Sequence, residues 1–110
     1  MYDRSHLIDD LRRPSAYDHP VDTVELVETH ISWVLLAGEY AYKLKKPVDL
    51  GFVDFSTLEK RLNCCREEMR LNGRLAPELY LGIVPVALDE ESRARLCGSG
   101  AAIEYAVKMA

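Results

Sequence analysis

The stretch that most constrains the fold is residues 29–46, in which two β-prone runs flank a short turn at 37–39. The first run is almost wholly apolar, and the second, residues 40–45, alternates along its length. A short turn that contains glycine between two such runs predicts a β-hairpin. In the second run the two-residue period of a strand separates two faces, with Ala41, Lys43 and Lys45 on one and Tyr40, Tyr42 and Leu44 on the other.

The chain before and after this hairpin predicts helices and further strands. Residues 3–13 space apolar side chains at helical intervals, and residues 14–22, with two prolines, predict a linker or an arm lying on the body. Residues 24–28 predict a strand that a tight connection at 29–32 joins to the hairpin. Ser56 with Glu59 has the form of a capping box, and Ser56 or Thr57 starts a helix over 57–75. Its apolar stripe would be Leu58, Leu62, Cys65, Met69 and Leu75.

Two more strands are expected after this helix. Residues 79–88 contain Pro85, which predicts an edge strand or a bent one. Residues 89–100 form a polar turn region, and residues 101–109 alternate as a final strand. The order predicts an α+β domain, in which one long helix packs on a five-stranded antiparallel sheet and a short helix precedes it. Residues 1–20 would form the N-terminal helix and arm, and residues 21–110 the main body.

Charge and cysteine content narrow the classes of partner. The formal net charge of −4 argues against nucleic acid and membrane surfaces as partners, whereas the cluster of Lys43, Lys45 and Lys46 leaves room for a small anion. The three cysteines contain no CxxC pair, and the three histidines show no metal-binding spacing. We therefore expect no metal site and a reducing compartment, and the lack of any long apolar run predicts a soluble, cytoplasmic protein.

The order of elements, with a strand lysine followed by a helix glutamate, resembles the N-terminal lobe of the kinase fold. It is most similar to the aminoglycoside phosphotransferase-like small-molecule kinases, in an uncharacterised bacterial branch. The resemblance rests on THISWVLLAGEYAYKLKKPVDLGFVDFSTLEKR and EEMRLNGRLAPELYLGIVPV, and it covers residues 20–110. It implies ATP with Mg²⁺ as the cofactor and transfer of a phosphoryl group to a small-molecule acceptor.

The same resemblance implies roles for residues of the second hairpin run and the long helix. Ala41 would pack on adenine, and Lys43 would contact the α- and β-phosphates, with Lys45 on the same face as the alternate. A glutamate on the following helix orients this lysine in kinases. Glu68 lies among apolar neighbours on the helix, where a carboxylate needs a partner, so we expect Glu68 in this role and keep Glu67 as the alternate.

Two further assignments concern the loop and the hinge of the resembled fold. Thr29 and Ser32 occupy the place of the phosphate-covering loop, although the segment has no glycine and a plain polar turn remains the alternative. Residues 103–106 resemble the kinase hinge, so that backbone groups of Glu104 and Ala106 would bind adenine.

The chain has no His-Gly-Asp motif, which the catalytic half of this family carries. We therefore expect no catalytic residue here. The catalytic aspartate, the Mg²⁺ ligands and the acceptor contacts would belong to a second lobe, and the chain would be an inactive fragment. Such a fragment would expose an apolar edge near 103–109 and would self-associate or be marginally stable. The alternative is a free-standing protein-interaction module without nucleotide binding.

Overall fold

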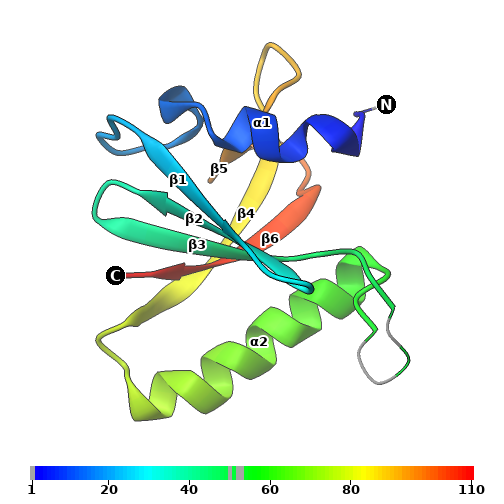
Figure 1. The fold of residues 1–110 in the computed structure, drawn as a ribbon, viewed down its shortest axis with the longest axis vertical. Coiled ribbons are helices and arrows are strands. Elements are labelled where there is room, and N and C mark those ends of the chain that lie inside the picture. Colours follow the sequence, from blue (N-terminus) through cyan, green and yellow to red (C-terminus); the bar gives the residue numbers. More distant parts are fainter. Residues whose placement is uncertain (1, 50, 52–53) are drawn as a thin grey trace.

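The computed structural model describes residues 2–49, 51 and 54–110 and shows a mixed α+β fold (Figure 1). A curled antiparallel sheet has the long helix on one side and the N-terminal segment on the other. In chain order the elements are η1 (Arg4–His6), α1 (Leu7–Leu11), η2 (Pro14–Ala16), β1 (Val24–Glu28), β2 (Ser32–Ala37), β3 (Tyr40–Lys45), α2 (Leu58–Leu75), β4 (Tyr80–Leu88), β5 (Ala94–Leu96) and β6 (Glu104–Met109).

The sheet has six strands in the order β1-β2-β3-β6-β4-β5, one more than the sequence predicts. The additional strand is β5, which lies within the segment expected to be a polar turn and pairs with only the last three residues of β4. Three residues are too few to show a period, and for that reason the prediction missed this strand. All pairs of neighbouring strands are antiparallel, as expected.

The hairpin formed by β2 and β3 confirms the strongest prediction from the sequence. Its register pairs Ala37 with Tyr40 across a turn at Gly38 and Glu39. Gly38 has φ +63°, and a Cβ there would lie 2.8 Å from the carbonyl oxygen of Pro20. Both the backbone conformation and the close approach of the arm therefore favour glycine at this position.

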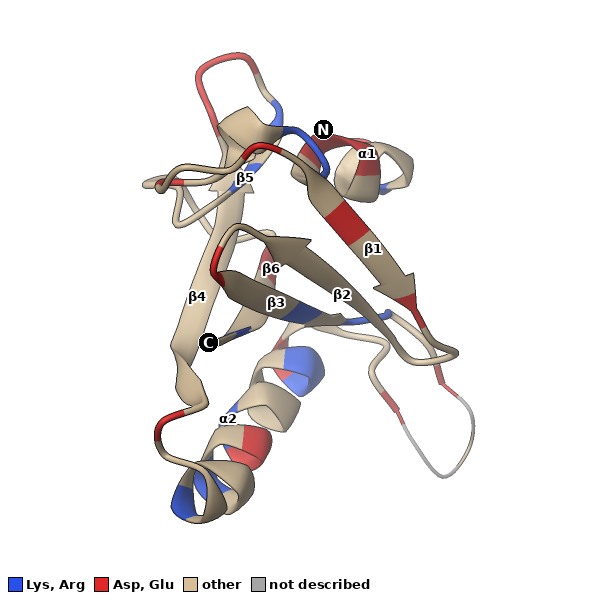
Figure 2. Cartoon of the chain, turned by 60° about the vertical axis from the view of Figure 1, so that its left-hand side comes forward, with Lys and Arg blue, Asp and Glu red and all other residues tan. Residues whose placement is uncertain are grey.

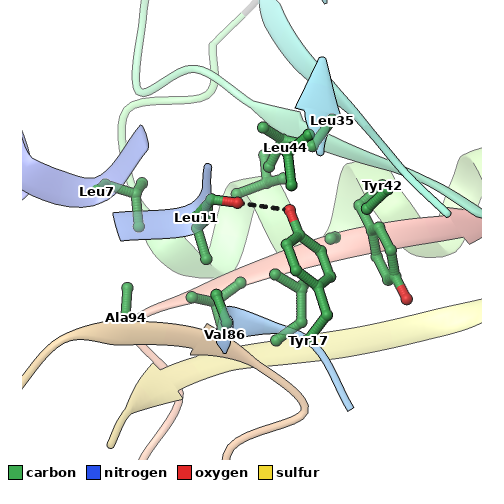
Figure 3. Packing of buried hydrophobic residues seen from close by; sticks show 13 residues of the cluster. Leu7, Leu11, Tyr17, Leu35, Tyr42, Leu44, Val86 and Ala94 are labelled. Atoms are coloured by element: carbon green, nitrogen blue, oxygen red, sulfur yellow. Dashed lines mark hydrogen bonds between the residues drawn. The ribbon is translucent and has the colours of Figure 1, made fainter. Parts of the chain in front are cut away.

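The hydrophobic core lies between the sheet and the N-terminal segment (Figure 3). Leu7 and Leu11 of α1 are one turn apart and fully buried, and Tyr17 donates a hydrogen bond from its hydroxyl to the Leu11 carbonyl, 2.6 Å away. Residues 14–22 are thus an arm on the body, one of the two predicted alternatives. The sheet contributes alternate residues to this core, among them Leu35, Tyr42, Leu44, Val86, Leu96 and Ala106.

Helix α2 packs against the other face of the sheet, over β6 and β4. Its N-cap is Thr57, whose side chain accepts a hydrogen bond from the Lys60 amide, whereas Ser56 donates its hydroxyl to Asp54. The expected capping box of Ser56 and Glu59 is therefore wrong, because the cap is Thr57 and the residue three positions later is Lys60, which has no carboxylate to complete a box. The apolar stripe is also overextended, because Leu75 at the helix end is 86% exposed.

Strands β4 and β6 lie inside the sheet, which decides between the two alternatives for β4 and corrects the prediction for β6. Pro85 is not on an edge strand, because β4 lies between β6 and β5. Its carbonyl accepts a hydrogen bond from the amide of Cys97, the residue that follows β5. Its nitrogen, which has no hydrogen to donate, therefore lies on the same side of β4, just beyond the end of β5. Strand β4 also carries a bulge between Tyr80 and Gly82, in agreement with the bent alternative. Strand β6 is flanked by β3 and β4, so residues 103–109 do not form the apolar edge that we expected.

Exposed apolar side chains lie elsewhere. Four leucines are exposed between the end of α2 and the start of β4, and two further apolar side chains are exposed on β1 and β2: Leu71, Leu75, Leu79 and Leu81, with Val27 and Leu36. No helix within the described part of the chain combines the length and the apolar character that crossing a bilayer requires.

Candidate functional site

The candidate site is an ion cluster between strand β3 and helix α2. Lys43 and Lys45 are two residues apart on the strand, so both side chains leave the sheet on the same face, where both meet Glu68 of α2. In Figure 2 the ribbon of α2 lies below that of β3. The opposite face of the strand carries Tyr42 and Leu44, which are fully buried in the core. The predicted division of the two faces is confirmed.

Glu68 of α2 contacts both lysines. Its Oε1 accepts a hydrogen bond from Lys45 Nζ at 2.8 Å, and its Oε2 lies 3.7 Å from Lys43 Nζ. The neighbouring Glu67 is directed elsewhere, because it is exposed and pairs with Arg70. The helix carboxylate in reach of the strand lysines is thus Glu68, as the sequence predicts, and its tighter partner is Lys45 rather than Lys43.

The two lysines differ in exposure. The side chain of Lys45 is 6% exposed and that of Glu68 is 9% exposed, whereas the side chain of Lys43 is 30% exposed. Burial lowers the pKa of Lys45, but the hydrogen bond and charge of Glu68 outweigh it and raise the pKa above its ordinary value. Lys45 is therefore a fixed, charged partner of Glu68, and Lys43 presents a second positive charge at the surface.

The cluster has two positive charges and one negative charge, so it carries a net charge of about +1 at neutral pH. An anion that reached Lys43 would meet this excess charge without displacing Glu68 from Lys45. Burial raises the pKa of the neighbouring Cys65 thiol on α2 to about 11, so this thiol stays neutral and adds no negative charge. The arrangement suits the binding of an anionic group beside Lys43.

The sheet surface next to Lys43 is apolar. Val34 is the cross-strand partner of Lys43, and Leu36 is the partner of Ala41 one pair further along. These side chains share the face of Lys43 by register, and Leu36 is exposed, with Glu25 of β1 as its partner on the other side. Ala41 is thus brought beside the lysine cluster on a surface that can contact a flat apolar group.

Thr29 lies in the turn between β1 and β2, and Ser32 is the first residue of β2. Ser32 is buried and is the cross-strand partner of Lys45, so it lies near the cluster. The two hydroxyl oxygens are 2.9 Å apart, and Thr29 Oγ1 also accepts from the amides of Ile31 and Ser32. These groups are engaged within the turn itself, which agrees with the plain-turn alternative.

The hinge assignment of Glu104 and Ala106 does not fit their positions. Ala106 lies inside β6, where it pairs with Leu44 of β3 on one side and Val84 of β4 on the other, so neither flank of its backbone is open to a ligand. Glu104 is paired with Val86 and is fully buried. The sequence could not reveal this pairing, because the backbone partners of a strand residue leave little trace in side-chain identity.

The Glu104 side chain belongs to a second ion cluster that the sequence did not reveal. Its carboxylate accepts from Arg61 Nε at 3.0 and 3.1 Å and from Arg4 Nη2 at 2.8 Å. Arg61 also donates to the Phe55 carbonyl. Arg61 is buried although it lies among charged residues in the sequence, where an exposed arginine is the ordinary expectation. This cluster ties α2 and the N-terminal segment to β6.

In the part of the chain that the structure describes, His, Cys, Asp and Glu side chains form no group of three or more that could hold a metal ion. The three cysteines are free thiols.

Comparisons with known proteins give relatives but no family. Over 68 residues the chain is 48% identical to an uncharacterised protein of Mycobacterium bovis and to uncharacterised proteins of two strains of Mycobacterium tuberculosis. The match covers 59% of this chain and 14% of each relative, so the chain spans a small part of the length of these proteins. No family model matches the chain, and no solved structure matches it.

Proposed function

We propose that this chain is the ATP-binding lobe of a kinase-like small-molecule phosphotransferase, in which Lys43 contacts phosphate and the Lys45–Glu68 pair holds the site in shape. The single observation that carries the proposal is the shared carboxylate, with Lys45 bound at 2.8 Å and the more exposed Lys43 at 3.7 Å. A buried pair fixes the position of Glu68, and the second lysine keeps unused capacity to donate hydrogen bonds.

The surroundings of the cluster support a nucleotide over a bare phosphate. An apolar sheet surface with Leu36 and Ala41 adjoins Lys43, so a base could lie on the sheet while its phosphates reach the lysine. The order of a lysine strand, a glutamate helix and further strands, of which β4 and β6 were expected and the short β5 is additional, supports the resemblance to the kinase N-terminal lobe. Mg²⁺ would accompany ATP, and its ligands and the acceptor contacts would belong to a second lobe. A cytoplasmic location follows from the proposal, because ATP is available there.

The proposal is tested by titrating Mg²⁺-ATP into the purified chain and into two lysine variants. The affinity is measured from NMR chemical-shift changes or by isothermal titration calorimetry. Lys43→Ala should weaken binding about ten- to a hundredfold, because charge-assisted hydrogen bonds contribute roughly 1.5–3 kcal/mol. Lys46→Ala is the matched control. Lys46 pairs with Glu28 and lies over the Trp33 ring, so it should leave the affinity within about twofold. Equal losses in the two variants would refute the assignment of Lys43.

A protein-interaction module is the second candidate, and the exposed leucines favour it. Leu71, Leu75, Leu79 and Leu81 lie along the end of α2 and the start of β4, where scattered single leucines would be ordinary but a group of four is not. If the chain is a protein-interaction module, titration with Mg²⁺-ATP should produce no saturable change in the NMR spectrum or in the heat of binding. Leu75→Glu should then abolish self-association, measured by analytical ultracentrifugation, without lowering the melting temperature.

A further inference from the structure

A hollow of about 680 Å³ lies at the β4–β5 end of the molecule, apart from the lysine cluster. Its walls come from three segments: the N-terminal arm with Arg13, the turn after β4 with Asp89, and the stretch from Arg95 through the Gly98-Ser99-Gly100 loop. In Figure 2 the β4–β5 end of the sheet lies at the top of the molecule, and α2 lies at the bottom. The proposed ATP site makes no use of any of these residues.

Arg95 in this hollow has an unused hydrogen-bond donor. It sits in the middle of β5, paired with Ala87 of β4. Its Nε is buried and, among the described residues, is the one buried side-chain nitrogen or oxygen that lacks a hydrogen-bond partner. The guanidinium also forms no ion pair within the described residues, although several carboxylates line the same hollow. A buried donor of this kind needs an acceptor, and nothing in the described protein supplies one.

The loop that follows β5 is held close to this arginine. A Cβ at Gly98 would lie 2.9 Å from the Ala87 side chain and 3.3 Å from Arg95 Cγ, so the loop can approach the sheet only with glycine here. The backbone amides of Gly98, Ser99 and Gly100 have no backbone acceptor among the described residues. Arg95 and the three loop residues line the same hollow, so the loop amides and the Arg95 guanidinium are donors available to a ligand there.

The other charged groups of the hollow restrict the ligand. Arg13 is fixed by its hydrogen bonds to the carbonyls of Asp10 and Ala94. Asp89 accepts from the amides of Glu91 and Arg93 and lies 3.7 Å from Arg13, so it is engaged in its own turn. Glu90 and Glu91 are exposed at the rim, and their charge repels polyanions such as nucleotides.

We propose that the hollow binds a small, singly charged carboxylate, whose oxygens accept hydrogen bonds from Arg95 and from the loop amides. A planar carboxylate matches the fork of a guanidinium, and its single charge minimises repulsion by the acidic rim. This second ligand site is independent of the proposed ATP site.

The test is a titration of the ¹⁵N-labelled chain with sodium acetate at constant ionic strength, set against sodium chloride. Acetate should shift the Arg95 Nε–H signal and the amides of Gly98, Ser99 and Gly100 along one saturable curve. Arg95→Gln should weaken acetate binding at least tenfold. Arg66→Gln is the matched control, because Arg66 is an exposed helix arginine whose described contact is Asn63, and it should leave binding unchanged.

The Arg95 Nε–H signal of the unmodified chain keeps the test valid even if Arg95→Gln fails to fold. A shift of that signal that grows linearly without saturation, or one that chloride reproduces, would overturn the proposal. So would equal acetate affinity in Arg95→Gln and the unmodified chain. Inorganic phosphate, which is largely doubly charged at pH 7.5, should bind more weakly than acetate, and stronger binding of phosphate would refute the choice of a singly charged ligand.

Discussion

Glu68→Gln is the substitution that most clearly separates the roles of the two strand lysines. In the folded chain the Lys45 ammonium is nearly inaccessible to water and its charge is balanced by Glu68. Glutamine keeps the shape and one acceptor oxygen but removes the negative charge, which leaves a buried ammonium without a counter-ion. Removing one partner of a buried ion pair costs about 3–5 kcal/mol of unfolding free energy. Because the amide oxygen still accepts a hydrogen bond, we expect about 3 kcal/mol.

The matched variants have a predicted order. Lys45→Met removes the buried ammonium and leaves Glu68 with Lys43, so its cost should be smaller, about 1–2 kcal/mol. Lys43→Ala removes a longer, more exposed contact, which solvent screens, and should cost less than about 1 kcal/mol. A domain of this size has a stability of roughly 5–15 kcal/mol, so all three variants should fold.

The assay is urea denaturation followed by circular dichroism at pH 7, with the slope compared between variants. This pH is far below the pKa of about 10.4 of lysine in an unfolded chain, so the stabilisation by Lys45, whose folded pKa is raised, is fully present. It should be lost only as the pH rises through the folded pKa. A cost below about 1 kcal/mol for Glu68→Gln, or a cost of Lys43→Ala equal to that of Lys45→Met, would refute the reasoning.

Three further outcomes follow from the described contacts. Gly38→Ala should cost about 2 kcal/mol or more in urea denaturation, because φ is +63° and the new Cβ would press on the Pro20 carbonyl; no measurable loss would mean that the turn differs. Burial raises the pKa of Asp10, but the hydrogen bonds from the Tyr2 hydroxyl and the Ala94 amide outweigh burial and lower the pKa below its ordinary value. The free energy of unfolding should therefore fall as the pH drops below about 4, and Asp10→Asn should make the plot of unfolding free energy against pH flatter in this range. Burial raises the pKa of Cys65 to about 11, so iodoacetamide at pH 8 should label Cys64 in the native chain while Cys65 stays protected until urea is added; equal labelling would contradict the packing of α2.

Elements with a clear period could be predicted from the sequence. The hairpin from Ser32 to Lys45, the long helix and the two faces of β3 follow from alternation, helical spacing and one glycine. The predictions that failed concern features that are short or that depend on local backbone geometry. Strand β5 is only three residues long, and Ser56 and Thr57 are equally good caps by residue type. Only the backbone at the helix start decides between them.

The candidate site divides in the same way. The sequence could predict that Lys43, Lys45 and Glu68 lie close together, because the strand and helix periods place them on facing surfaces. It could not predict which lysine is the tighter partner of Glu68, since this depends on the position of α2 along the sheet. That position follows from tertiary packing around Cys65 and Arg61. The buried role of Glu104 was also hidden, because its partners lie 43 and 100 positions away in the chain.

The most direct test of the proposed nucleotide site observes the lysine side chains themselves. In a chain labelled with ¹³C at lysine, Mg²⁺-ATP should shift the ε-CH₂ signal of Lys43 along a saturable curve, with a smaller change at Lys45 and none at Lys46. The difference follows from exposure and pairing, because Lys43 has a charge within reach of a ligand whereas Lys46 is paired with Glu28 on the other side of the strand. Shifts of equal size at Lys43 and Lys46, or no saturable shift at Lys43, would contradict the proposal that this face of the sheet binds ATP.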